Sequence, residues 1–222
     1  MTKHTDAPYK PSLRHVFIIN AIAVSVFISL MVVGCSRNGT RPAVDSANRE
    51  LKEIRTPDIL FVPTPQVVVD KMLELAKVTE DDLIYDLGCG DGRIVVTAAK
   101  RYGCRGVGYD IDPIRVVESM ENVKKNNVGN LVLIEQKDIF TLDLSKASVI
   151  TLYLLESLNV KLIPQLEKLK PGTRIVSHDF SMRGIVTPDT TVTVNSSGYH
   201  HDTIYLWTAP LKRNDVKTGS AD

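Results

Sequence analysis

The 222-residue sequence has few cysteines, almost no net charge and no internal repeat. Its three cysteines cannot form a framework of paired disulfides, and their spacing matches no zinc motif. Twenty-seven Lys and Arg against 26 Asp and Glu leave a net charge of +1, which gives no general electrostatic reason to expect nucleic-acid binding. The length is enough for one domain with a substantial core and a further segment.

One long apolar run lies near the amino terminus. Residues 16–33 carry no charge, follow a segment with three basic residues, and are followed by Gly34 and Cys35. The run is marginal for spanning a bilayer and long for a signal core. Residues 32–35 resemble a bacterial lipoprotein processing site, in which the cysteine is lipidated. Either interpretation attaches the protein to a membrane. Three Lys and Arg precede the run and three more lie in residues 34–49, so the side of the membrane is left open.

These features predict four parts of the chain. We expect a lipoprotein-like or transmembrane anchor over residues 1–35 and a polar tether over residues 36–58. A folded domain is expected over residues 59–210, followed by a disordered tail over residues 211–222.

Residues 83–110 predict a nucleotide-binding unit. An apolar strand leads into a glycine-rich turn, Asp86–Gly92 (DLGCGDG), and residues 93–102 then read as a helix. A second strand, residues 105–110, ends in an acid. Glycines are needed in such a turn because a ligand approaches bare backbone there. The terminal acid, Asp110, can offer its carboxylate to ribose hydroxyls.

The spacing of this turn separates two kinds of cofactor. A dinucleotide site requires G-x-G-x-x-G and holds a pyrophosphate, whereas this turn reads G-x-G-x-G. The carboxylates of Asp86 and Asp91 would repel a pyrophosphate. They suit a ligand with a cationic end, such as the amino and sulfonium groups of S-adenosylmethionine (SAM). The string resembles motif I of the class I, seven-strand methyltransferases, which implies SAM as the cofactor.

The remaining pattern alternates helices and strands. It predicts an α/β fold with a Rossmann-like, doubly wound sheet of seven strands, mostly parallel and closed by an antiparallel strand. Further strands are expected at residues 131–135, 147–155, 173–179, 191–194 and 203–207. Three further helices are expected. The first follows Thr64, the predicted N-cap, with Pro65 as its first residue, and the second follows Asp112, with Val116, Met120 and Val123 buried. The third runs along residues 158–169, where Pro164 either kinks the helix or begins its main part.

Four segments together give a more specific resemblance: residues 62–65, 85–93, 152–159 and 169–180. In that order they are similar to the membrane-anchored protein-lysine methyltransferases that act on the ATP synthase c-subunit and the adenine nucleotide translocase, and to their bacterial relatives. The resemblance covers most of the expected domain. It implies the class I fold, SAM as cofactor and methylation of a lysine ε-amine.

The resemblance also implies roles for residues of the cofactor site. Asp86, Gly88 and Gly90 would hold the methionine part of SAM, and Asp110 would hold the ribose. In the loop after the third strand, Asp138 would take the adenine amino group while Ile139 packs on the ring. Asp91 and Ile111 complete the expected cofactor-binding set.

The acceptor side is expected beyond the fourth and fifth strands, where ligands of doubly wound sheets bind. Tyr153, Glu156, His178 and Asp179 are the candidates for orienting or deprotonating the amine, and Thr64 and Asn159 are the candidates for substrate binding. Ser177, His178 and Asp179 name a hydrolase triad, but neighbours on a strand point to opposite faces, which argues against a relay. His200, His201 and Asp202 are expected to be solvated, and no metal is predicted.

Two departures from the relatives leave the acceptor open. Glu156 stands where relatives commonly have proline, and residues 181–185 replace a more acidic, tryptophan-containing stretch. Methyl transfer to a small molecule or lipid is therefore an alternative, as is a membrane-tethered SAM-binding module without turnover. The expected partners are a protein substrate, with membrane-embedded proteins included, and the membrane itself; no nucleic acid and no metal are expected.

Overall fold

The computed structural model describes residues 61–198 and 201–214. The expected anchor and tether lie outside the described residues, and no helix among those described is both long and apolar enough to cross a membrane. Residues 211–214 are held against the domain: Arg213 bridges to Val186 and pairs with Glu167, and the Asn214 amide donates to the Ile185 carbonyl. The folded part therefore extends beyond residue 210.

Seven strands form one sheet in the order β3-β2-β1-β4-β5-β7-β6. The first five are parallel to one another, and β7 runs antiparallel to both of its neighbours, as the sequence predicts. The strands are β1 (Leu83–Leu87), β2 (Arg105–Asp110), β3 (Val132–Gln136), β4 (Val149–Leu152), β5 (Arg174–His178), β6 (Thr190–Asn195) and β7 (His201–Thr208).

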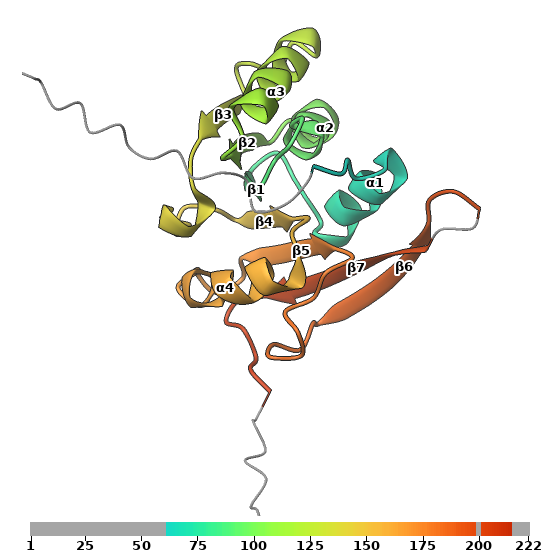
Figure 1. The fold of residues 1–222 in the computed structure, drawn as a ribbon, viewed down its shortest axis with the longest axis vertical. Helices are drawn as coiled ribbons and strands as arrows, with labels where there is room; N and C mark the ends of the chain where they lie inside the picture. Colours follow the sequence, from blue (N-terminus) through green and yellow to red (C-terminus); the bar gives the residue numbers. More distant parts are fainter. Residues whose placement is uncertain (1–60, 199–200, 215–222) are drawn as a thin grey trace, which may run out of the picture. The chain divides into compact units, whose positions relative to one another are not determined.

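Helices cover both faces of this sheet (Figure 1). On one face α1 (Gln66–Leu75), α2 (Arg93–Tyr102) and α3 (Pro113–Lys125) bury a common apolar cluster. On the other face α4 (Glu156–Leu166) and the short 3₁₀ helix η1 (Ile139–Thr141) share a second cluster with Trp207. The strands at the centre are therefore buried on both sides, and all four residues of β4 are buried.

Local chemistry accounts for where the helices begin and end. α2 begins after Gly92 and ends before Gly103, both of which have positive φ. α3 begins at Pro113, and the Asp112 side chain caps it by accepting a 2.8 Å hydrogen bond from the Ile114 amide. The predicted bounds of α2 and β2 match the structure residue for residue.

Four local predictions need correction. Pro65, not Thr64, is the N-cap of α1, and no side chain caps that helix. In α3, Met120 is 50% exposed and Ser119 takes the buried position, because the helix turns that face toward Gly92. Pro164 lies inside α4, which begins eight residues earlier, so of the two alternatives for Pro164 the one in which it begins the main part of the helix is wrong. The fourth strand is also shorter than its apolar run, because residues 153–155 leave the sheet for the cavity described next.

Candidate active site

A cavity of about 530 Å³ opens at the carboxyl ends of β1, β2 and β4. This is the edge at which doubly wound sheets bind ligands, and the volume is in the range of small-molecule sites. Most of the predicted cofactor residues line it: Asp86, Gly88, Asp91, Asp110, Ile111, Asp138 and Ile139. Thr64 and Tyr153 from the predicted acceptor side also line it.

The glycine turn forms the floor of the cavity. Gly88 and Gly90 have φ of +80° and +55°, which residues with a Cβ rarely adopt. The Gly90 amide donates a 2.8 Å hydrogen bond to Oδ2 of Asp110. A Cβ on Gly90 would lie 2.1 Å from the Phe61 ring, which is itself covered by the Arg115 guanidinium. The turn is thus held between the end of β2 and the first described residue of the chain.

Asp110 is fixed at the tip of β2 by backbone amides. In addition to the Gly90 amide, the Asp112 amide donates to Oδ1 at 2.9 Å. Burial raises the pKa of Asp110, although these backbone hydrogen bonds oppose the rise. Each carboxylate oxygen can accept a second hydrogen bond, so Asp110 is oriented to receive the hydroxyls of a ribose.

Asp86 is the most unusual group in the cavity. It is 1% exposed, Thr151 donates a 2.6 Å hydrogen bond to its Oδ1, and its Oδ2 has no hydrogen-bond partner among the described residues. Burial, with the nearby charges of Asp110 and Asp91, raises the pKa of Asp86 to about 7. A buried carboxylate oxygen without a partner is costly unless a ligand satisfies it. An ammonium group, such as that of SAM, fits this position.

Asp91 lines the cavity and also forms an ion pair within the protein. Its carboxylate pairs with the Arg93 guanidinium, at 2.5 Å from Nη2 and 2.9 Å from Nε. Arg93 also donates to the Thr64 carbonyl at 2.7 Å. Asp91 lines the cavity, but its charge is balanced within the protein. Its main effect is to hold the Phe61–Thr64 segment over the glycine turn through Arg93.

The loop after β3 supplies the opposite wall. Asp138 caps η1 by accepting a 3.0 Å hydrogen bond from the Phe140 amide. Ile139, the first residue of η1, and Ile111, the residue after β2, complete an apolar surface beside it. A carboxylate next to apolar side chains suits an adenine ring, as the resemblance implies.

Aromatic rings form the acceptor side. Tyr153 and Phe180 both line the cavity, with ring centroids 6.1 Å apart and planes within 27° of parallel. His178 lies behind Tyr153, with a centroid distance of 3.9 Å. Burial raises the pKa of Tyr153, and the charges of Asp179 and Asp202 raise it further. Tyr153 is therefore a neutral phenol at the cavity wall at neutral pH.

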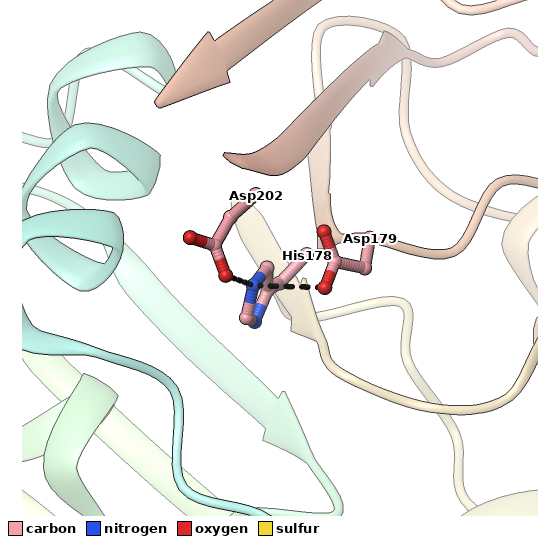
Figure 2. A group of neighbouring side chains, drawn as sticks. All are labelled: His178, Asp179 and Asp202. Atoms are coloured by element: carbon pink, nitrogen blue, oxygen red, sulfur yellow. Dashed lines mark hydrogen bonds and ion pairs between the residues drawn. The ribbon is translucent and has the colours of Figure 1, made fainter. Parts of the chain in front are cut away.

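His178 and Asp179 do meet, which corrects the argument from strand geometry for this pair, whereas the Ser177 hydroxyl donates to the Phe180 carbonyl. His178 ends β5, and Asp179 leaves the strand with φ of +56°. This turn brings Oδ2 of Asp179 within 3.3 Å of Nε2 of His178. Oδ1 of Asp202 lies 2.9 Å from the same nitrogen (Figure 2). Side chains alternate between the two faces of the sheet only along β5, and β5 ends at His178.

Glu156 and Asn159 stand outside the cavity lining. Glu156 begins α4 and accepts hydrogen bonds from Ser181 at 2.9 Å and Arg183 at 3.3 Å. Asn159 is fully buried and donates to the Phe180 carbonyl at 2.9 Å. Both side chains hold the segment after β5, and with it the Phe180 wall. The structure gives them a supporting position and no contact with the cavity.

Sequence reasoning missed several residues of the site. Thr151 is the single polar residue inside the most apolar strand, and this signal could have indicated a partner for Asp86. The sequence pattern places Asp202 only among candidate metal ligands, with its neighbours His200 and His201. Phe61, Arg115 and Phe180 carry no signal that distinguishes them from ordinary core or surface residues.

Comparisons with known proteins agree with this geometry. The family described as the ANTKMT methyltransferase domain matches residues 86–190. A protein-lysine N-methyltransferase of Saccharolobus islandicus is 46% identical over 153 residues, which are 68% of this chain and 94% of that protein. A crystal structure described as an RNA methyltransferase from Salinibacter ruber, in complex with S-adenosyl-L-homocysteine, is 52% identical with a TM-score of 0.64. It covers 69% of this chain and 97% of that one.

A more distant neighbour supports the fold alone. The crystal structure of TrmN from Thermus thermophilus has a TM-score of 0.55 at 16% identity, covering 67% of this chain and 48% of that chain. The relative from Saccharolobus islandicus is matched over nearly its whole length, at an identity at which fold and family are shared. The chain therefore belongs, with that protein, to the family of SAM-dependent methyltransferases defined by the ANTKMT methyltransferase domain.

Proposed function

We propose that the protein transfers a methyl group from SAM to the ε-amine of a protein lysine. The observation that carries this proposal is the cavity at the carboxyl edge of the sheet, with the unpartnered oxygen of Asp86 on one side and the Tyr153–Phe180 wall on the other. The name of the relative from Saccharolobus islandicus, a protein-lysine N-methyltransferase, supports the same substrate class.

SAM, when bound, supplies an electrophilic methyl group on a sulfonium. The protein's part is to hold the cofactor and to present the amine in line with the bond that breaks. Asp86 would hold the ammonium group, Asp110 the ribose, and Asp138 with Ile139 the adenine. Correct placement of two reactants can lower a barrier by about 7–11 kcal/mol, so rigid walls contribute directly to the rate.

The acceptor side suits a lysine side chain. Its four methylenes can pass between apolar and aromatic groups, and a cationic ammonium is attracted to the faces of Tyr153 and Phe180. The ammonium must lose a proton before it can attack. A desolvated, partly apolar site lowers the pKa of a lysine and so favours the reactive amine.

The description of the Salinibacter ruber neighbour makes RNA the second candidate acceptor. The charges of the cavity favour protein over RNA. In the described part of the chain, three cationic residues line the cavity: Arg93, Arg115 and Lys137. They are paired with Asp91 at 2.5 Å, Glu118 at 2.6 Å and Glu135 at 2.5 Å, respectively. A phosphate in this cavity would have to compete with these carboxylates for the same cations.

One experiment separates these acceptors. The purified protein would be incubated with methyl-labelled SAM and a cell extract, and the products divided into protein, RNA and lipid fractions. Label in a protein band that acid hydrolysis releases as methyl-lysine is the expected result. Label in the RNA or organic fraction would contradict the proposal, and label in no fraction would favour a SAM-binding module without turnover. An Asp110→Ala variant serves as the control for transfer that depends on the cofactor site.

We further propose that residues 16–35 attach the protein to a membrane. The support is the uncharged run of 18 residues followed by Gly34 and Cys35. The wild-type protein should sediment with membranes, and a variant without residues 1–35 should not. A Cys35→Ser variant that loses incorporation of labelled fatty acid would identify the anchor as a lipid, and a reporter fused after Asp222 would define the side of the membrane.

A further inference from the structure

Three groups from distant parts of the chain form a line that leads from the cavity into the protein. Oγ1 of Thr64, a cavity-lining residue, lies 3.3 Å from Nδ1 of His178. Nε2 of His178 lies 2.9 Å from Oδ1 of Asp202. His178 is fully buried and does not line the cavity, so Thr64 is its hydrogen-bonding contact with the cavity.

The two carboxylates determine which nitrogen of His178 carries the proton. Oδ1 of Asp202 and Oδ2 of Asp179 both lie within 3.3 Å of Nε2, and a carboxylate can only accept (Figure 2). Nε2 is therefore the protonated nitrogen of the neutral ring. Nδ1 is left as an acceptor, and the Thr64 hydroxyl lies beside it. The ring is oriented as a base toward the cavity.

We propose that Thr64, His178 and Asp202 form a proton relay that deprotonates the amine acceptor; this inference rests on the proposed function. The N–H bond of the ammonium breaks, its electron pair stays on nitrogen, and the proton goes to Oγ1 of Thr64. The proton of that hydroxyl passes to Nδ1 of His178, which becomes an imidazolium. The carboxylates of Asp202 and Asp179 stabilise this cation. After the product leaves, the Nδ1 proton returns through the Thr64 hydroxyl to water in the cavity, which restores the neutral ring with its proton on Nε2.

Burial makes this arrangement more than a packing feature. Asp202 is 2% exposed, and a buried carboxylate is costly unless its partners compensate the lost hydration. The two carboxylates beside Nε2 hold the neutral ring in one tautomer and compensate the positive charge that the ring gains when a proton is transferred to it. Among the described residues, the Tyr153 ring lies against His178, the Thr203 amide donates to Oδ1 of Asp179, and Arg93 holds the Thr64 carbonyl. Arg93 is itself balanced by Asp91.

The first test needs no turnover. ¹⁵N spectra of the histidine side chains in the wild-type protein without substrate, at pH 8, should show a ring with a proton on Nε2 and none on Nδ1. In the Asp202→Asn variant, the new amide cannot hold that proton as a carboxylate does, and a mixture of tautomers is expected. A proton on Nδ1 in the wild-type protein would overturn the relay, whatever the methylation assays show.

The second test uses a matched pair of variants. Thr64→Val removes the hydroxyl while keeping the shape, and Thr64→Ser keeps the hydroxyl. We expect Thr64→Val to lower kcat on a lysine peptide by about 10²–10⁴-fold, the range of general base catalysis, and Thr64→Ser to restore most of it. Thr193→Val, an exposed threonine on β6, is the control for the substitution itself. Calorimetry should show SAM affinity within twofold of wild type for all three variants.

The pH profile separates a relay from a structural role. Without the relay only amine that is already neutral can react, so kcat/KM of Thr64→Val should rise about tenfold per pH unit toward the pKa of free lysine, about 10.4. The wild-type profile should be flatter. Equal profiles, or activity lost with a chelator and restored by a divalent metal at His178, would contradict the relay. If the wild-type protein methylates no lysine at all, the proposed function fails, and the spectra still judge the geometry of the three side chains.

Discussion

The Thr151 hydroxyl donates a 2.6 Å hydrogen bond to Oδ1 of Asp86, across the paired strands β4 and β1. The bond fixes the orientation of a buried carboxylate and leaves Oδ2 without a partner in the described part of the chain. Oδ1 of Asp86 thus positions the carboxylate, and Oδ2 is available to a ligand. Two predictions depend on this division.

SAM affinity should depend on the ionisation of Asp86. Its pKa in the free protein is about 7, and only the carboxylate attracts an ammonium group. Affinity should therefore fall as the pH drops below 7, by up to tenfold per unit. Asp86→Asn should weaken SAM binding about 100-fold and flatten this pH dependence in calorimetry between pH 5.5 and 8. Asp143→Asn, an exposed acid outside the cavity, is the control; equal pH profiles for wild type and Asp86→Asn would contradict the assignment.

The same group should make the free protein less stable at high pH. The folded-state pKa of Asp86 is raised above its ordinary value of 3.8, so the folded state holds a proton that the unfolded state has lost. Stability should fall as the pH rises from about 4 to 7. We expect Asp86→Asn to be more stable than wild type by about 1–3 kcal/mol at pH 8 in urea unfolding without SAM, and the difference to shrink below pH 4. A destabilised Asp86→Asn at pH 8 would show that the carboxylate has another partner.

Gly90 and Gly172 offer a matched pair for the glycine turn. Both have positive φ, +55° and +87°, so alanine at either position costs about 1–2 kcal/mol in backbone strain. Nothing lies within 4 Å of a Cβ at Gly172, whereas a Cβ at Gly90 collides with Phe61. Gly90→Ala should abolish SAM binding by calorimetry, and Gly172→Ala should leave it within twofold of wild type. Intact binding in Gly90→Ala would mean that Phe61 moves freely from the turn.

Tyr153 and Glu156 should differ in kinetic effect. Tyr153 lines the cavity, so Tyr153→Phe should lower kcat by about 10-fold or more by removing a polar contact near the reacting amine. Glu156 contacts Ser181 and Arg183 outside the cavity, so Glu156→Gln should mainly raise KM for the acceptor. Steady-state kinetics on a lysine peptide measure both. Unchanged turnover in both variants, with SAM binding intact, would show that neither Tyr153 nor Glu156 contributes to the reaction.

A buried ion pair stabilises the opposite edge of the sheet. Asp82 accepts hydrogen bonds from Ser148, at 2.7 Å, from the Thr79 amide, at 2.8 Å, and from Arg174. Burial raises the pKa of Asp82, but these hydrogen bonds and the Arg174 charge outweigh it, so the net pKa is lowered. This stabilisation is present above about pH 4 and is lost as the pH falls through the lowered pKa.

The corresponding variant tests this sign. Asp82→Asn should reduce stability by about 1–3 kcal/mol at pH 7, and the difference from wild type should disappear toward pH 2. SAM affinity should not change, because Asp82 lies at the other end of β1 from the cavity. A loss of SAM binding in the folded variant would show that the two edges are coupled.

The part of the fold that sequence predicted well is the part specified by local chemistry. Alternation, apolar runs and the glycines at positions 88, 90 and 92 located β1, α2 and β2 and the turn between them. The cofactor side was predictable because its residues lie within one short unit and one loop. The Met120 face of α3 was mispredicted because tertiary packing, not helical spacing alone, decided which residue is buried.

The acceptor side was much less predictable. Thr64 and His178 are 114 residues apart, and no local pattern joins them. Asp179 approaches His178 only because a positive φ interrupts the alternation at that residue. Thr64 was expected to cap a helix, and instead its carbonyl is bound by Arg93 and its hydroxyl faces the imidazole. These are long-range relations, which depend on how strands are ordered in the sheet.

The direction of β7 has a consequence for the chemistry open to this kind of sheet. A parallel strand presents its last residues at the ligand-binding edge, whereas β7 runs the other way and brings its opening residues, His201 to Thr203, beside the end of β5. If that strand ran parallel to β5, residues from its closing end would lie there in place of Asp202. Because β7 is antiparallel to β5, residues from its beginning lie near the cofactor site. The other residues of that site come mainly from much earlier parts of the chain.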